Sequence, residues 1–423
     1  MAALISGFSK LTKTEKIDWL AQNFLQNTKE AKEILRTYWN SDEKLQQLHD
    51  DFIENTISNF YMPYGIAPNF MINGNHYTIP MAIEESSVVA AASLVAKFWS
   101  NKGGFTAKVI NTVKVGQVHF MYQGSKADLE RYFSAKKDEL YRATKDITKN
   151  MEKRGGGILD IELRDITSHL ENYYQLHVTF ETVDSMGANF INSCLEAMAN
   201  VFKNNEVEIV MSILSNYVPE CLVKASVSCH VDDLHPTDGA LFAKKMEQAV
   251  AIANVEPHRA VTHNKGVMNG IDAVVIATGN DFRAIEAGVH AYAAKSGKYK
   301  SLTKCQIKDD VFTFSIEIPL ALGTVGGLTS THPLSKLSLE ILGNPSAKEL
   351  MQIIAVAGLA QNYAALRALT TTGIQEGHMK MHLVNILNQL EADAEEKEKV
   401  TLAMKGKTVS YSGVVAALEK VRA

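Results

Sequence analysis

The sequence predicts an α+β fold in which a small ferredoxin-like domain interrupts a larger mixed α/β domain. The first observation is the order of elements between residues 114 and 214, where strand and helix patterns follow one another as β-α-β-β-α-β. The second is that the segments on both sides contain strands and long helices of their own. The third is a charged, helical segment that follows a break at Gly373. A chain of 423 residues is long enough for two or three domains.

The composition is that of an ordinary globular protein and argues against several functional classes. Charged residues make up 21% of the chain and apolar residues 46%, and the net charge is −4. We therefore expect no general binding of nucleic acid or membrane. No apolar run reaches the roughly 20 residues that span a bilayer, and the N-terminus lacks the apolar stretch of a signal peptide. The four cysteines form no CxxC motif and the thirteen histidines no HExxH motif, so we expect reduced thiols, no metal and a cytoplasmic location.

The first hundred residues predict a helical arm, a hairpin and a helix that follows two carboxylates. Residues 10–57 have apolar positions at helical spacing, and the alternation over Ile72–Ile79 is typical of a hairpin. Glu84 and Glu85 precede two serines that can cap an Ala-rich helix through Trp99. Carboxylates at a helix start interact favourably with its dipole, but unpaired charges beside apolar segments are costly. Both a structural and a functional role stay open on these residues.

A turn of small residues stands out within the β-α-β-β-α-β segment. We expect the six elements at Lys114–Tyr122, Lys126–Lys153, Ile158–Arg164, Tyr173–Val183, Gly187–Phe202 and Val207–Leu214. The turn Asp184–Asn189 leads into the second helix, where free amides and the helix dipole favour an anion such as pyrophosphate. It is not a GxGxxG fingerprint, and a purely structural βα turn uses similar residues.

The stretch Pro257–Gly288 predicts a polar loop, a buried strand and a capped helix. Gly266 and Gly270 are expected to bend the loop, Ala273–Ala277 is a β-like run, and a helix is expected to start near Phe282. Loops on a rigid scaffold often present reactive groups.

This stretch also concentrates charge, with the cations Arg259 and Lys265 and the carboxylate Asp281. A strand–turn–helix unit with ordinary polar turns is the alternative.

Three features follow in the last third of the chain. The glycine-rich loop Gly323–Gly327 can pass close to a ligand. The small-residue helix Ala347–Thr372 is typical of close helix packing, including packing between subunits. His378 follows a glycine break and heads the C-terminal segment; a lone histidine is usually structural, but this position suits a mobile acid or base.

Four blocks of sequence carry a resemblance to a known family. They are EESSVVAAAS at Glu84–Ser93, DSMGAN at Asp184–Asn189, THNKGVMNG with ATGND at Thr262–Gly270 and Ala277–Asp281, and GIQEGHM at Gly373–Met379. In order and spacing they resemble 3-hydroxy-3-methylglutaryl-coenzyme A (HMG-CoA) reductase of the class II, soluble bacterial type. The absence of a membrane-anchoring N-terminal region also looks like class II. The resemblance implies reduction of HMG-CoA to mevalonate and coenzyme A with two hydrides from a nicotinamide cofactor.

The resemblance implies four catalytic residues, which are Glu85, Lys265, Asp281 and His378. A fixed ammonium at Lys265 suits the oxyanion formed by hydride attack on a thioester. An imidazolium at His378 suits protonation of the leaving thiolate, and Glu85 suits proton donation to the aldehyde oxygen. Asp281 is implied to set the charge state of the Lys265–Glu85 pair.

The resemblance also implies substrate and cofactor contacts. Arg259 suits bidentate binding of the substrate's free carboxylate, and further substrate contacts are implied at Ser87, Asn216, Asn269 and Gln361. The implied cofactor residues are Asp184, Met186, Gly187, Ala188, Asn189 and Thr148.

The implied fold is a large substrate and dimerisation domain, residues 1–108 and 218–374, interrupted by a small NAD(P)-binding domain, residues 109–217. A helical C-terminal flap follows at residues 375–423. The family works as a homodimer with active sites at the subunit interface. We therefore expect the cofactor block from one subunit and the block with Lys265 and Asp281 from the other.

Two positions depart from the family's pattern. Ser86 stands where the family usually has proline, which loosens the turn beside Glu85. Thr148 occupies a position that is acidic in NAD-dependent relatives, and it lies among Lys145, Lys149, Lys153 and Arg154. A hydroxyl among cations accepts a 2′-phosphate that a carboxylate repels, so we predict NADPH as the preferred cofactor, with NADH possible.

Two alternatives to the reductase are considered. One is the same enzyme run in reverse, as an NAD-dependent enzyme that oxidises mevalonate, which Thr148 argues against. The other is a CoA-thioester lyase or CoA-binding protein on the same scaffold.

Overall fold

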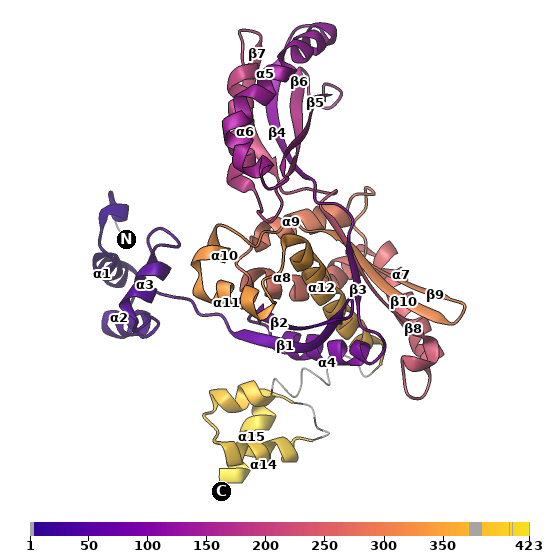
Figure 1. Ribbon diagram of the computed structural model, residues 1–423. Coiled ribbons are helices and arrows are strands. Elements are labelled where there is room, and N and C mark those ends of the chain that lie inside the picture. Colours follow the sequence, from indigo (N-terminus) through magenta and orange to yellow (C-terminus); the bar gives the residue numbers. More distant parts are fainter. Residues whose placement is uncertain (1–3, 372–382, 406, 408, 423) are drawn as a thin grey trace. The chain divides into compact units, whose positions relative to one another are not determined.

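The computed structural model describes residues 4–371, 383–405, 407 and 409–422 (Figure 1). The N-terminal unit, Met1–Pro63, contains η1 (Phe8–Lys10), α1 (Lys13–Phe24), α2 (Thr28–Thr37) and α3 (Glu43–Asp50). The first of these α-helices begins at a capping box, in which Thr12 and Glu15 each accept the other's amide. The helices predicted over residues 10–57 are confirmed. Among the described helices, none is long and apolar enough to cross a membrane.

The second unit begins with a hairpin, β1 (Tyr64–Ile72) and β2 (Asn75–Ala82). Both residues of its turn have positive φ, 51° at Asn73 and 82° at Gly74. This geometry matches the right-handed twist of the two strands, and Asn-Gly adopts it readily. The predicted hairpin is confirmed.

Helix α4 (Val88–Ser100) follows the two glutamates, but not with the predicted serine cap. Ser87 occupies the N-cap position with φ 76°, in the left-handed region, and its side chain makes no capping hydrogen bond. A capping side chain normally requires an extended backbone at this position, which explains the difference. A left-handed residue with a Cβ costs about 1–3 kcal/mol, so the turn that carries Glu85 is held in an unusual conformation by its surroundings.

The second unit contains a four-stranded antiparallel sheet and the helices that accompany it. Its strand order is β3 (Thr106–Val109), β8 (Leu222–His230), β10 (Val311–Pro319) and β9 (Thr303–Lys308). The accompanying helices are η2 (Val231–Asp233), α7 (Gly239–Val255), α8 (Pro257–Ala277), α9 (Phe282–Ala293), α10 (Leu328–Thr331), α11 (Pro333–Ile341) and α12 (Ala347–Thr370).

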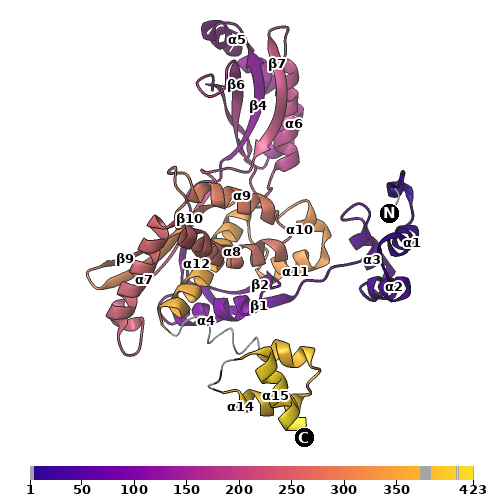
Figure 2. The same cartoon turned by 180° about the vertical axis from the view of Figure 1, so that it is seen from behind.

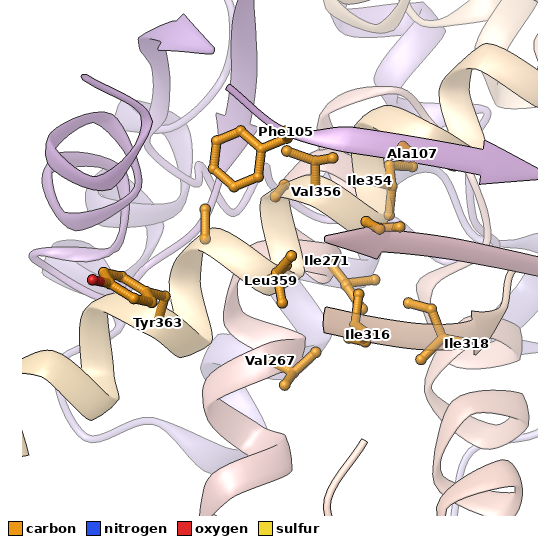
Figure 3. Close-up of a cluster of buried hydrophobic side chains, with 14 of the residues drawn as sticks. Phe105, Ala107, Val267, Ile271, Ile316, Ile318, Ile354, Val356, Leu359 and Tyr363 are labelled. Atoms are coloured by element: carbon orange, nitrogen blue, oxygen red, sulfur yellow. The ribbon is translucent and has the colours of Figure 1, made fainter. Parts of the chain in front are cut away.

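The core forms where α8 and α12 pack on each other and on this sheet. Figure 3 shows Val267 and Ile271 of α8 beside Leu359 of α12 and Ile316 of β10. The two helices approach closely because both carry glycine at the contact. A Cβ at Gly270 would lie 2.4 Å from the carbonyl oxygen of Ala357. The predicted close packing of a small-residue helix is confirmed within the chain.

Pro257–Ala277 is one continuous helix, so the predicted loop and strand are wrong. Pro257 is in the first turn, and Glu256 caps the helix by accepting from the amides of His258 and Arg259. The final turns are buried on all sides except at Asp272 and Ile276. Periodicity alone cannot separate such a short buried run from a strand. The expected helix at Phe282 is confirmed as α9.

The segment between β3 and β8 forms a separate sheet with its own core. Its elements are β4 (Lys114–Tyr122), α5 (Lys126–Glu152), β5 (Gly157–Asp165), β6 (Tyr173–Glu181), α6 (Ala188–Phe202) and β7 (Val207–Ser215). The antiparallel strand order is β5-β6-β4-β7, and α5 and α6 lie side by side on the sheet (Figure 2). The predicted β-α-β-β-α-β order is confirmed. Because β3 and β8 are hydrogen-bonded neighbours, the segment is inserted between two adjacent strands of the larger sheet.

The C-terminal segment is helical, as predicted. It contains a helix over residues 383–389, α14 (Ala394–Ala403) and α15 (Tyr411–Arg422). Leu387, Val400 and Val414 belong to its own apolar cluster. The GIQEGHM block, with His378, lies outside the described residues.

Candidate functional site

Helix α8 presents Lys265 and Asn269 on one face, one turn apart. The Nζ atom of Lys265 lies 2.5 Å from Oε2 of Glu85, and Nδ2 of Asn269 donates to the same oxygen at 3.2 Å. The side chains of Lys265 and Glu85 are 59% and 35% exposed, so a small molecule can reach the pair. The structure thus brings together three predicted residues, which combine a cation, a carboxylate and an amide donor.

Asp281 lies beyond the other end of α8. It is the N-cap of α9, where its carboxylate accepts from the amides of Arg283 and Ala284 at 3.1 and 3.2 Å. The twelve helical steps from Lys265 to Ala277 span about 18 Å. Within one chain Asp281 therefore does not reach the Lys265–Glu85 pair, although the resemblance implied that it sets the charge state of that pair.

Asp281 instead lines a pocket together with the predicted cofactor turn. Four segments line this pocket: the turn and the start of α6, the α8–α9 junction, the glycine-rich loop and the end of α5. The lining residues are Ser185–Phe190, Ile276, Gly279–Arg283, Gly323, Val325–Thr329, Ile147, Asn150, Met151 and Arg154. The glycine-rich loop was expected to approach a ligand, and it lies at this pocket.

The start of α6 suits an anion. Gly187 is at the N-cap with φ 86°, and no side chain caps the helix. The first amides are therefore left for another acceptor, with the positive end of the helix dipole behind them. A Cβ at Gly187 would lie 2.5 Å from Cγ2 of Thr182, so only glycine fits this turn.

Asp184 anchors the turn to the larger part of the unit. Its carboxylate accepts from the amide of Ala347, the first residue of α12, at 2.8 Å, and its carbonyl oxygen accepts from Thr324 at 2.8 Å. Of the predicted cofactor residues, Met186, Gly187, Ala188 and Asn189 line the pocket, whereas the carboxylate of Asp184 is engaged in this anchor.

The structure does not bring Thr148 to the pocket. Its side chain is buried and its hydroxyl donates to the carbonyl of Lys145 at 3.3 Å. The pocket residues Ile147, Asn150 and Met151 recur at helical spacing on α5, and Thr148 lies off that face. Arg154, two residues after the end of α5, is a cation that lines the pocket.

The remaining predicted substrate contacts are divided between the two ends of α8. Arg259 lies in its first turn, and burial lowers the pKa of its guanidinium. Gln361 of α12 packs against Gly270, and its buried Oε1 has no partner among the described residues. Ser87 is exposed, two residues after Glu85. Asn216 lies at the cofactor end, where it lines a small cavity with Met186.

Sequence reasoning missed Asp272, seven residues after Lys265 and on the same face of α8. Burial, together with Glu286 and Glu84, raises the pKa of Asp272 to about 9. Glu286 in turn pairs with His290 at 2.5 Å, and the pKa of Glu286 is lowered by that hydrogen bond. A spacing of seven residues places Asp272 on the same face as Lys265 only if the segment is a helix, and the sequence predicted a loop and a strand.

Sequence reasoning also missed Lys114, which lies under the turn of the cofactor pocket. Its ammonium donates to Oγ1 of Thr182 at 2.5 Å and to the carbonyl oxygen of Ser185 at 2.7 Å. A lysine at the start of a strand gives no sequence signal for such burial.

Comparison with known proteins gives a consistent assignment. The family model described as hydroxymethylglutaryl-coenzyme A reductase matches residues 13–383. The 3-hydroxy-3-methylglutaryl-coenzyme A reductase of Archaeoglobus fulgidus is 39% identical over 406 residues, which cover 96% of this chain and 91% of the relative. A probable 3-hydroxy-3-methylglutaryl-coenzyme A reductase of Borreliella burgdorferi is 36% identical over 430 residues, covering 99% and 97%.

Solved structures agree. The class II enzyme of Streptococcus pneumoniae bound to NADPH in open conformations is 37% identical, with a TM-score of 0.74 over 87% of this chain and 100% of the other. A second structure of the Streptococcus pneumoniae enzyme is 36% identical, with a TM-score of 0.75 over 99% and 100%. The resemblance inferred from four sequence blocks is confirmed, and the chain belongs to the hydroxymethylglutaryl-coenzyme A reductase family.

Proposed function

We propose that this protein reduces HMG-CoA to mevalonate and coenzyme A, with two molecules of NADPH, in the mevalonate pathway of isoprenoid synthesis. The observation that carries the proposal is the 2.5 Å contact between Lys265 and Glu85, with Asn269 on the same oxygen. A thioester reduction needs a cation for the oxyanion and a proton donor beside it, and this half-exposed group supplies both.

NADPH, when bound, supplies the hydrides. The pocket residues fit such a dinucleotide, because α6 starts with uncapped amides and Arg154 lies at the rim. The amides bind phosphate oxygens, and the Arg154 guanidinium suits a 2′-phosphate. Arg154 takes over the role that the sequence argument gave to Thr148.

The residues of this chain divide the remaining work. The Lys265 ammonium stabilises the oxygen of the thioester and later of the aldehyde, and Glu85 gives that oxygen its proton. Arg259 is proposed to bind the free carboxylate of the substrate, with Ser87 and Gln361 at further polar positions. His378 is proposed to protonate the departing thiolate of coenzyme A, since a thiol leaves without the charge that a thiolate carries.

We also propose a homodimer in which each active site is shared between chains. The support is the separation along α8, about 18 Å from Lys265 to Ala277, which keeps Asp281 away from Lys265 within one chain. In this arrangement one chain supplies Lys265 and Glu85, and its partner supplies Asp281 and the cofactor pocket. This differs from the sequence expectation, in which Lys265 and Asp281 came from the same subunit.

The domain division remains part of the proposal. Residues 1–108 and 218–374 form the large domain, 109–217 the cofactor domain and 375–423 the flap. A cytoplasmic location is proposed as well, and the four unpaired cysteines support it.

The direct test is an absorbance assay of NADPH oxidation with HMG-CoA as substrate. We expect two NADPH oxidised for each coenzyme A released, and a lower KM for NADPH than for NADH. Release of coenzyme A without NADPH oxidation would overturn the reductase and indicate a lyase. A strong preference for NADH would overturn the cofactor assignment alone.

A further inference from the structure

Lys114 is a buried lysine for which the proposed reaction gives no role. It opens β4, and only 4% of its surface is exposed. Burying an ammonium is costly unless a counter-charge or several hydrogen bonds compensate for the lost water. The surroundings of Lys114 should therefore contain groups that compensate for the burial of its ammonium.

Lys114 has hydrogen bonds but no counter-ion of its own among the described residues. Its two acceptors, the Thr182 hydroxyl and the Ser185 carbonyl, are both neutral. Burial lowers the pKa of Lys114, whereas the nearby Cys221, Glu181 and Asp184 act to raise it.

Both carboxylates are engaged elsewhere. Glu181 accepts from the Thr112 hydroxyl and, at 2.8 Å, from the Val183 amide. Asp184 accepts from the first amide of α12. Neither carboxylate is hydrogen-bonded to Lys114, whose two hydrogen bonds both go to the turn before α6.

The acceptors of Lys114 belong to the turn that precedes α6. Thr182 also donates to the Ser185 carbonyl at 2.6 Å, and the Ser185 hydroxyl accepts from the Gly187 amide at 3.1 Å. Ser185, Met186 and Gly187 line the proposed cofactor pocket. The ammonium of Lys114 therefore bonds to the same turn that lines the pocket.

Charge and geometry then act in the same direction. The uncapped amides of α6 carry the partial positive charge of the helix N-terminus. The two hydrogen bonds of Lys114 hold the turn in the conformation that presents these amides to the pocket. We propose that Lys114 is a positioning residue for the cofactor turn and holds its amides in place for the pyrophosphate of a dinucleotide.

This inference rests on the proposed use of NADPH, so its test measures binding rather than turnover. Lys114→Met keeps the length and apolar stem of the side chain and removes the charge. We expect the Kd for NADPH, measured by fluorescence titration without HMG-CoA, to rise at least ~10-fold. Inorganic pyrophosphate should compete with NADPH in the wild-type protein and much less in the variant. The exposed Lys203, at the far end of α6, provides the control Lys203→Met, whose Kd should stay within about two-fold of wild type.

Kinetics separate positioning from a purely structural role. If Lys114 positions the cofactor turn, the KM for NADPH rises while the KM for HMG-CoA does not. An unchanged Kd for NADPH contradicts the proposal, and so does an equal loss of affinity for NADPH and HMG-CoA together with a lower Tm. If Lys114→Met does not fold, Thr182→Val removes one acceptor of Lys114 and should raise the Kd for NADPH about three-fold. Lys114-dependent NADPH binding without turnover of HMG-CoA would sink the reductase proposal and leave this one standing.

Discussion

The two ends of α8 carry different halves of the proposed reaction site. At the N-terminal half, Lys265 forms an open ion pair with Glu85 on a face that solvent reaches. Beyond the C-terminal end, Asp281 caps α9 and lines a pocket with the turn before α6. One end thus offers charge for a reacting oxygen, and the other offers a place for a dinucleotide. A single chain thus holds both halves but keeps them apart by more than half of the length of α8.

The largest expected effect is loss of the cation at the first end. Lys265→Met should lower kcat for HMG-CoA by about 10³-fold, since a preorganised charge beside a developing oxyanion contributes on this scale. Steady-state NADPH oxidation measures the loss. The exposed Lys244 of α7 supplies the control Lys244→Met, which should behave as wild type. A loss below ten-fold would remove Lys265 from the chemistry.

The division between the ends can be tested with mixed dimers. Lys265→Met and Asp281→Asn should each be nearly inactive as homodimers. Co-expression should recover about a quarter of wild-type activity if sites are shared, because half of the dimers are mixed and each mixed dimer contains one intact site. If every site came from one chain, the mixture would stay as inactive as its parents.

The cofactor end should respond to loss of Arg154. Arg154→Ala is expected to raise the KM for NADPH about ten-fold and to leave the KM for NADH nearly unchanged, since only NADPH carries the 2′-phosphate. The neighbouring Lys153 is exposed and does not line the pocket, so Lys153→Ala is the matched control. Equal changes for both cofactors would contradict the assignment.

The helix that joins the ends should be sensitive at one glycine and tolerant at another. Gly270→Ala places a Cβ 2.4 Å from the Ala357 carbonyl oxygen, whereas at Gly266 the nearest atom is 3.7 Å away. We expect Gly270→Ala to lower the free energy of unfolding by about 1–3 kcal/mol. Gly266→Ala should raise it by up to about 1 kcal/mol, because alanine favours the helix interior. Denaturant unfolding of both variants checks this, and similar values for the two would refute the packing argument.

The smallest expected effect is a pH dependence from Asp272, which lies between the ends. Its folded-state pKa is raised to about 9, mainly by burial, whereas in the unfolded chain it ionises near pH 4. Between these values the folded protein binds the extra proton, so the stability contributed by this group falls as pH rises through the window. The side chain of Asn does not titrate in this range. The Tm of Asp272→Asn minus the Tm of wild type should therefore be a few degrees larger at pH 8 than at pH 5. An equal Tm difference at both pH values would contradict the pKa.

The local sequence was sufficient to predict those elements whose structure depends on interactions between residues close in sequence. The Asn73-Gly74 turn favours a hairpin by its own backbone preferences, and the elements from Lys114 to Ser215 alternate clearly between strand and helix spacing. The family assignment also followed from sequence, because short blocks of reactive residues keep their spacing along the chain. Lys265, Glu85 and Asn269 were named from these blocks and lie together in the structure.

Other features depended on contacts between distant parts of the chain. The stretch from His258 to Ala277 contains polar residues and two glycines, and only its packing against α12 makes it a continuous helix. Thr148 appeared to face a cofactor, but the rotation of α5 on its sheet turns its hydroxyl inward. Lys114 and Asp272 have no sequence pattern of their own, since their burial is created by neighbouring elements.

By itself the sequence determined the family, the order of the elements and the residue types that carry the chemistry. These follow from the identity and spacing of residues along the chain. The tertiary structure alone decided which of those residues meet: it separated Lys265 from Asp281 by more than half of the length of α8 and put Asp281 beside the turn before α6. The physical reason is that helix length and packing set distances in space, and neither can be read from the spacing of residues until the helix itself is known.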